Sequence, residues 1–186
     1  MKFMKKLLSA VTAAAIGATM TTALSAGVST ASAASKTAVE LVEDMGLGWN
    51  LGNALDSTNT WTDSPTPEQI ETAWGNISTT ESMIKEVKKA GFNTVRIPVT
   101  WWDMTGKSGT ASMDAFDGTV GEAYLARVKE VVDYCVKNDM YAIINTHHDE
   151  EWEKDTSKIG TFEKLWKQIA TYFKDYDEHL VFEGMN

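Results

Sequence analysis

Short, almost entirely apolar runs alternate with amphipathic helical patterns along most of this chain, and this alternation limits its fold more than any other feature. Three of the apolar runs are NTVRIPV (93–99), MYAIINT (140–146) and HLVFEGM (179–185). Near-continuous apolar runs of this length are typical of strands covered on both faces. Strands that alternate with helices form parallel sheets, because each parallel connection needs a crossover. The sequence therefore predicts an α/β fold.

The helical patterns lie between these runs. STTESMIKEVKKAGF (78–92) predicts a helix in which Ser78 and Glu81 fit a capping box and Gly91 suits the C-terminus. Two further helices are expected in GEAYLARVKEVVDYCVKN (121–138) and TFEKLWKQIATYFKDY (161–176), where apolar residues recur at helical spacing. A first strand is expected within GLGWNLGN (46–53), and a long polar loop over residues 54–76.

Two closures of such a sheet are possible, an open doubly wound sheet or a (β/α)8 TIM barrel. No G-x-G-x-x-G motif follows any predicted strand, which counts against a dinucleotide-binding fold. A full barrel needs eight strands and about 250 residues. If the fold is a barrel, this chain of 186 residues holds only about its first four strands and three helices.

The first 33 residues have the three-part order of a secretory signal peptide. MKFMKK is basic, LLSAVTAAAIGATM is apolar and uncharged, and ASA at positions 31–33 fits a cleavage site. A membrane anchor is the alternative, but the apolar core is short and rich in Ala, Thr and Gly. We therefore expect a secreted protein without a membrane segment after cleavage, in which a lead-in (34–45) precedes one domain (46–186).

Charge and cysteine content narrow the function further. The net charge is −9 and there is no basic stripe, which argues against nucleic acid as a partner. The single cysteine, Cys135, excludes an internal disulfide and falls in an apolar helical pattern, so we expect it to be buried.

Polar and aromatic residues gather where the predicted strands end. VRIPVTWW contains Arg96, Trp101 and Trp102, NTHHDEEW contains His147 and His148, and the last strand leads to Asn186. In both architectures the active site lies beyond the carboxyl ends of the strands. These residues are therefore the candidate site.

Arg96 lies within an apolar strand and needs a carboxylate partner, since an unpaired buried charge is costly. It either forms a core salt bridge, for instance to Glu183, or keeps a catalytic carboxylate ionised. Glu183 stands three residues before the strand tip, roughly 10 Å lower by strand rise. We interpret it as the partner of a buried cation, not as a catalytic acid.

The adjacent histidines do not predict a metal site, because neighbouring side chains on a strand point to opposite faces. The other histidine, His179, starts a strand and so lies at the opposite end. We expect no metal and no cofactor, and imidazoles that position a hydroxyl or a carboxyl. The chain also has seven tryptophans, of which those in loops and at strand ends, such as Trp61, suit sugar rings, although core packing is the alternative for any one of them.

Four segments in order, GWNLGNALD, AGFNTVRIPVTW, YAIINTHHDE and LVFEGMN, resemble family 5 of the glycoside hydrolases, the cellulase family. ETAWGN and TTESMIKEVKKAGF look most like its bacterial endo-β-glucanase branch of broad specificity, subfamily 4. The resemblance runs from about Gly46 to the last residue. It implies a (β/α)8 barrel and retaining hydrolysis of internal β-1,4 bonds in a β-glucan polysaccharide.

The resemblance also implies roles for individual residues. Arg96 resembles the family's arginine beside the nucleophile, and His147 resembles the histidine hydrogen-bonded near the catalytic centre, with His148 beside it. Asn186 resembles the asparagine that contacts the sugar 2-hydroxyl. The residues implied to line the glycone side are Asn50, Asn53, Trp61, Trp101 and Trp102. In the family, the acid/base glutamate directly follows that asparagine and the nucleophile ends the seventh strand, so both are expected beyond this chain.

We therefore expect the N-terminal portion of a secreted endo-β-1,4-glucanase whose catalytic domain is monomeric, with cell-surface attachment through further modules left open. The 186-residue chain alone is expected to be inactive and prone to association. A mannanase or xyloglucanase of the same family stays open, as does a non-catalytic secreted sugar-binding protein. An unrelated (β/α)8 enzyme acting on phosphorylated substrates is the remaining alternative.

Overall fold

The computed structural model describes residues 36–58, 65–102, 116–148 and 154–186, nearly all of them within the compact unit Ala38–Asn186. The predicted signal peptide (1–33) and Trp61 lie outside the described residues. The elements are α2 (Ala38–Met45), β1 (Gly48–Asn50), α3 (Pro67–Glu71), α4 (Glu81–Lys89), β2 (Thr94–Ile97), α5 (Glu122–Lys137), β3 (Tyr141–Asn145), the 3-10 turn η2 (Thr156–Lys158), α6 (Ile159–Tyr172) and β4 (Leu180–Glu183). Within the described ranges, every helix is too short or too polar to cross a lipid bilayer.

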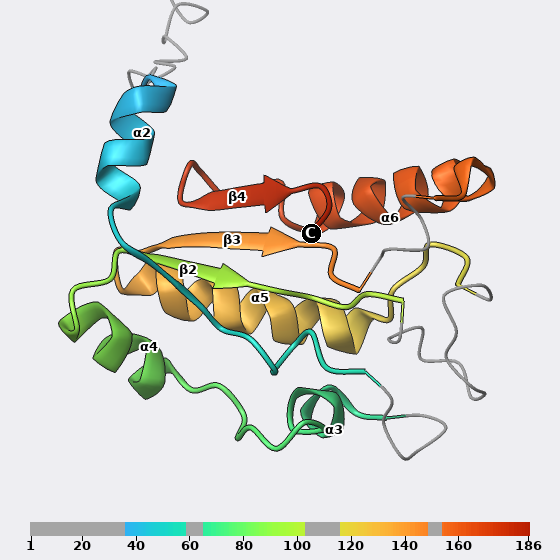
Figure 1. Cartoon of the computed structure of the whole chain (residues 1–186), viewed down its shortest axis with the longest axis horizontal. Helices are drawn as coiled ribbons and strands as arrows, with labels where there is room; N and C mark the ends of the chain where they lie inside the picture. Colours follow the sequence, from blue (N-terminus) through green and yellow to red (C-terminus); the bar gives the residue numbers. More distant parts are fainter. Residues whose placement is uncertain (1–35, 59–64, 103–115, 149–153) are drawn as a thin grey trace, which may run out of the picture. The chain divides into compact units, whose positions relative to one another are not determined.

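The four strands form one parallel sheet in the order β1-β2-β3-β4, which confirms the predicted α/β fold. Each strand lies beside its neighbour in sequence, and helices α4, α5 and α6 provide the crossovers. The arrows of β2, β3 and β4 point the same way in Figure 1, so their carboxyl ends meet at one edge of the sheet. We call this edge, with the segments that follow the strands, the carboxyl edge.

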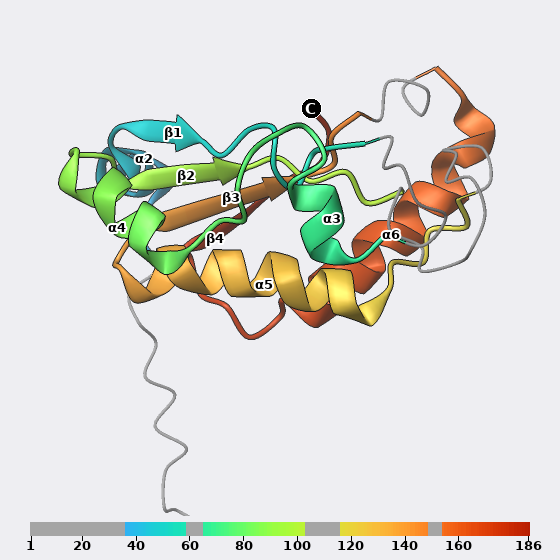
Figure 2. The same ribbon diagram turned by 90° about the horizontal axis from the view of Figure 1, so that it is seen from below.

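The two faces of the sheet differ in composition. Val95 pairs with Ala142 and Ile97 with Ile144, and all four are fully buried. Helix α5 lies along the sheet (Figure 2), and this burial of aliphatic side chains is the main source of stability. On the opposite face Arg96 pairs with Ile143, and both are only partly buried. The strands therefore present their charged residues on the more open face.

Helix α5 follows the predicted apolar pattern. Leu125, Val128, Val131, Val132 and Cys135 are all buried, at the spacing expected of one helix face. Cys135 is thus a small buried residue, as predicted. The sequence periodicity was sufficient to predict this helix because its buried side chains all lie on one face.

Helix starts differ from the predictions. Helix α4 begins at Glu81 with Thr80 as its N-cap, whose Oγ1 accepts from the Met83 N–H at 3.4 Å, so the capping box predicted at Ser78 is wrong. A complete capping box instead joins Thr66 and Gln69 at the start of α3. That helix lies inside the segment predicted as loop, because a five-residue helix is too short to show periodicity.

Candidate active site at the carboxyl edge

Arg96 and Glu183 form a bidentate ion pair across the open face of the sheet. The Arg96 Nε donates to Glu183 Oε2 at 2.7 Å and its Nη2 to Oε1 at 2.6 Å. The same Nη2 donates to the Asn186 Oδ1 at 3.0 Å. Parallel N–H···O bonds of this kind fix orientation as well as charge. The prediction that Glu183 is the partner of Arg96 is confirmed.

This pairing sets the charge of both groups. Hydrogen bonds from Arg96 hold the pKa of the Glu183 carboxyl below its usual value, against the opposing effect of partial burial. A hydrogen bond from the Asn145 amide and a smaller electrostatic effect of the nearby His147 act in the same direction. Glu183 in turn raises the pKa of Arg96, with a smaller contribution from the Asp56 charge. Glu183 is therefore an ionised acceptor, and it is poorly suited to donate a proton.

The segments after β2 and β3 are joined by hydrogen bonds around Asn145. Its Oδ1 accepts from the Val99 N–H at 3.1 Å, and its carbonyl accepts from the Trp101 indole Nε1 at 2.7 Å. Its Nδ2 lies 3.2 Å from Nδ1 of His147. The His147 N–H closes the arrangement by donating to the Val99 carbonyl at 2.9 Å. These bonds carry the sheet pairing past the ends of the regular strands.

His147 and His148 do not point to opposite faces as expected. They follow β3, and His148 has a φ of 55°, a left-handed conformation that breaks the alternation of a strand. Their ring centroids lie 4.7 Å apart at an edge-to-face angle of 80°. Trp74 places its ring edge-to-face with His148 at 5.5 Å, and the Trp102 indole donates to the His148 carbonyl at 3.0 Å. The two imidazole rings therefore contact each other and do not point to opposite faces of the sheet.

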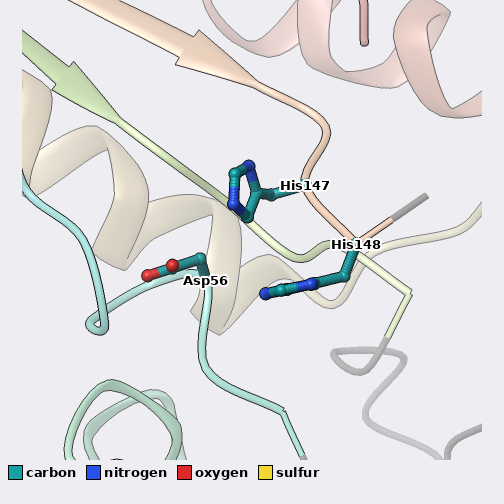
Figure 3. Close-up of side chains that lie close together, drawn as sticks. All are labelled: Asp56, His147 and His148. Atoms are coloured by element: carbon teal, nitrogen blue, oxygen red, sulfur yellow. The ribbon is translucent and has the colours of Figure 1, made fainter. Parts of the chain in front are cut away.

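Asp56, in the segment after β1, lies close to both histidines (Figure 3). Its side chain is buried, with Oδ1 accepting from the Ala54 N–H at 2.8 Å. One carboxylate oxygen and one nitrogen from each ring lie within 4.8 Å of one another. Carboxylate and imidazole are also metal ligands, so whether an ion fits depends on which ring nitrogen of His147 carries a proton.

The remaining predicted residues divide into exposed and buried ones. Asn50 and Asn53 are exposed, and Asn53 has a φ of 60°, which asparagine tolerates in a turn. Trp102 is partly buried. Trp101 is 1% exposed and packs edge-to-face against Tyr124 at 6.0 Å. It belongs to the core, so its prediction as a sugar platform is wrong, because its ring faces are covered.

Two residues close to the centre of the site were not among the predicted site residues. Asn145 is the only polar residue of YAIIN, and Asp56 ends the run GWNLGNALD. A polar side chain that ends an apolar strand is a usable signal, because a buried amide must find partners. Asp56 could be recognised only as one of several acidic residues near the predicted strand ends.

A comparison with family models identifies this arrangement. The model described as Cellulase (glycosyl hydrolase family 5) matches residues 55–186, which include β2, β3, β4 and every residue of the Arg96 network. The chain belongs to glycoside hydrolase family 5. Its parallel sheet is the corresponding part of a (β/α)8 barrel, as predicted.

Similar proteins with known names support this family assignment. Endoglucanase A of Clostridium longisporum is 44% identical over 160 residues, which cover 83% of this chain and 29% of that protein. A solved GH5-4 broad specificity endoglucanase from Ruminococcus champanellensis with bound cellotriose is 48% identical, with a TM-score of 0.71 over 81% of this chain and 43% of that one. A family 5 enzyme from Prevotella bryantii, solved as an E280A mutant with a xyloglucan tetradecasaccharide, is 39% identical with a TM-score of 0.70, over 81% of this chain and 44% of that one. The present family 5 chain thus spans less than half the length of these relatives.

Proposed function

We propose that this chain is the N-terminal part of a secreted, retaining endo-β-1,4-glucanase of family 5. The observation that carries the proposal is the Arg96–Glu183–Asn186 network at the carboxyl edge of a family 5 sheet. An arginine held by two hydrogen bonds to a carboxylate, and also bonded to an amide, is oriented and charged before a substrate arrives. Such preorganisation is what a glycosidase site requires.

Retaining hydrolysis needs two further groups. One carboxyl must act as nucleophile and another as acid and then base, at a separation of about 5–5.5 Å. Glu183 is unsuited to both roles because both of its oxygens are bound by Arg96. We propose that the two catalytic glutamates follow Asn186 in a longer protein, the first of them immediately.

The described residues would then support those glutamates. Arg96 would supply positive charge next to the nucleophile, and the Asn186 amide would bind the 2-hydroxyl of the sugar being cleaved. His147 and His148 would contact the substrate or a catalytic carboxyl from the end of β3. Trp74 and Trp102 border the histidine pair and are better placed than Trp101 to contact a sugar ring.

Cellulose-type β-glucan is the first substrate candidate because a relative at 48% identity binds cellotriose. Xyloglucan is the second, because the Prevotella relative binds a xyloglucan oligosaccharide. The basic and apolar N-terminal pattern supports export, so we propose that the mature protein works outside the cell.

The test is to read the gene beyond codon 186 and to express the extended frame. We expect a glutamate codon directly after Asn186. The extended protein should release reducing sugar from carboxymethylcellulose and xyloglucan, and Arg96→Met in that protein should reduce kcat on both by at least about 100-fold. A stop codon in the genomic sequence, or an extended protein that binds these polysaccharides without cleaving them, would favour the non-catalytic sugar-binding alternative.

A further inference from the structure

Asn145 ends β3 as a fully buried polar residue, in register with Glu183. A buried amide must use its donors and its acceptor, since each unsatisfied group costs free energy. The side chain lies between the backbone of Val99 and the ring of His147. Both contacts constrain which way the amide faces.

The backbone N–H of Val99 can only donate, so the side-chain atom 3.1 Å from it must be the Asn145 oxygen. The atom that faces His147 is then the amide nitrogen, which can only donate. At 3.2 Å it requires an acceptor, so Nδ1 of His147 must carry its lone pair. A neutral imidazole with a lone pair on Nδ1 holds its proton on Nε2.

We propose that Asn145 is a positioning residue that fixes His147 as the Nε2–H tautomer. The inference rests on the proposed function, because it gives Asn145 a role in the proposed hydrolase site. Asp56 supports the same state, because its buried carboxylate lies within 4.8 Å of a ring nitrogen of each histidine and favours a donor nearby. His147 therefore presents a donor at Nε2, and its partner there must be an acceptor such as a hydroxyl oxygen or a carboxylate.

The same tautomer makes the three-residue cluster unsuited to a metal ion. A metal must bind a ring nitrogen that carries no proton. Nδ1 of His147 is engaged by the Asn145 amide, and Nε2 is protonated. Binding an ion at Nε2 would turn an Nδ1–H toward the amide donor and break the bond between them. The proximity of Asp56, His147 and His148 therefore fits the recognition of an acceptor and not of a cation.

The test uses long-range ¹H–¹⁵N correlation spectra of the labelled 186-residue chain, without substrate, at a pH where the imidazoles are neutral. The chain has three histidines, and His179, which stacks on Tyr141 at the opposite end of the sheet, serves as the internal reference. We expect His147 to show a pyrrole-type Nε2 and a pyridine-type Nδ1. A pyrrole-type Nδ1 in the unaltered chain overturns the proposal, whatever the fate of the proposed function.

A single isosteric substitution tests the role of Asn145 directly. In Asn145→Asp, at a pH where the new carboxyl is ionised, one oxygen still accepts from Val99 and the other accepts where the amide donated, so Nδ1 should become protonated and its pyridine-type signal should vanish. Asn138→Asp is the matched control, because it adds the same charge at the C-cap of α5 and should leave His147 unchanged. A pyridine-type Nδ1 that persists in Asn145→Asp when the new carboxyl is ionised, with His179 signals unaltered, contradicts the proposal. If the variant loses the His179 signals of the folded chain, the tautomer of the unaltered chain decides alone.

Addition of zinc provides a third test of the tautomer. One equivalent of Zn²⁺ should leave the His147 ring signals of the unaltered chain in place. Stoichiometric binding that shifts both His147 and His148 would show that Nε2 is available to a cation, and would overturn the assignment.

Discussion

At the scale of single residues, Glu183 is held ionised by Arg96, and its stabilisation should depend on pH. Its folded-state pKa lies below the ordinary value of 4.5, so the contribution is present above that pH and is lost as the pH falls through the folded-state pKa. Both side chains are partly exposed, and solvent screening reduces the effect. We expect Glu183→Gln to lower the free energy of unfolding by roughly 1 kcal/mol at pH 7.

That difference should shrink as the pH falls below 4.5 and through the folded-state pKa, where the wild-type carboxylate takes up its proton. Guanidinium unfolding followed by tryptophan fluorescence, at matched protein concentration, measures it. Glu163→Gln, an exposed change on α6, is the control and should have little effect at either pH. An equal loss at neutral and acidic pH for Glu183→Gln would show that the ion pair is not its source.

Cys135 gives a second prediction at this scale. Burial in the α5 face raises the pKa of its thiol to about 12, so almost no thiolate is present at neutral pH. A thiol reagent such as DTNB should react with the native chain far more slowly than with the chain in guanidinium. Comparable rates in the two conditions would mean that α5 does not pack as described.

At the scale of elements, α3 is tied to α5 by a buried charge. Glu71 is fully buried and accepts from Arg127 Nε at 2.9 Å, from Arg127 Nη2 at 3.0 Å and from the Thr79 N–H at 2.7 Å. Arg127 also donates to the Thr79 carbonyl at 2.7 Å. These bonds join the segment between α3 and α4 to helix α5.

Arg127→Met should therefore be strongly destabilising, because it leaves the buried Glu71 charge without its partner. We expect a loss of about 3 kcal/mol or more in the free energy of unfolding. The matched control is Lys85→Met, which breaks the exposed pair with Glu81 on α4 and should cost less than about 0.5 kcal/mol. If the denaturant midpoints fall equally for the two variants, the Glu71–Arg127 ion pair does not hold α3 to α5 as described.

An element can be predicted from the sequence when the interactions that form it are between residues close together along the chain. Strand β3 and helix α5 were predicted because each carries a repeating apolar pattern that is local in sequence. Helix α3, the left-handed His148 and the burial of Trp101 were not, because each depends on one residue's conformation or on contacts between distant segments. The sequence predicted that Arg96, His147 and Asn186 would gather at the strand ends, and it missed Asn145 and Asp56, which lie among them.

At the scale of the whole molecule, the described sheet has β1 and β4 at its edges. Phe182 of β4 is 42% exposed, and the face that carries Arg96 is only partly covered. Exposed strand edges and apolar surface favour association. We expect the purified 186-residue chain to elute from gel filtration larger than a monomer, in proportion to its concentration. A concentration-independent monomer peak with a cooperative melt would contradict this.

The central claim is that this chain supplies the supporting part of a family 5 site, while both catalytic carboxyls come from sequence after Asn186. The most direct measurement is the release of reducing sugar from carboxymethylcellulose by the purified 186-residue chain. Arg96, His147 and Asn186 can orient and charge a reaction centre, but neither nucleophile nor acid is among them. We predict no release above a buffer control. Sustained release by the chain alone, abolished by Glu183→Gln, would contradict the account and make Glu183 a catalytic residue.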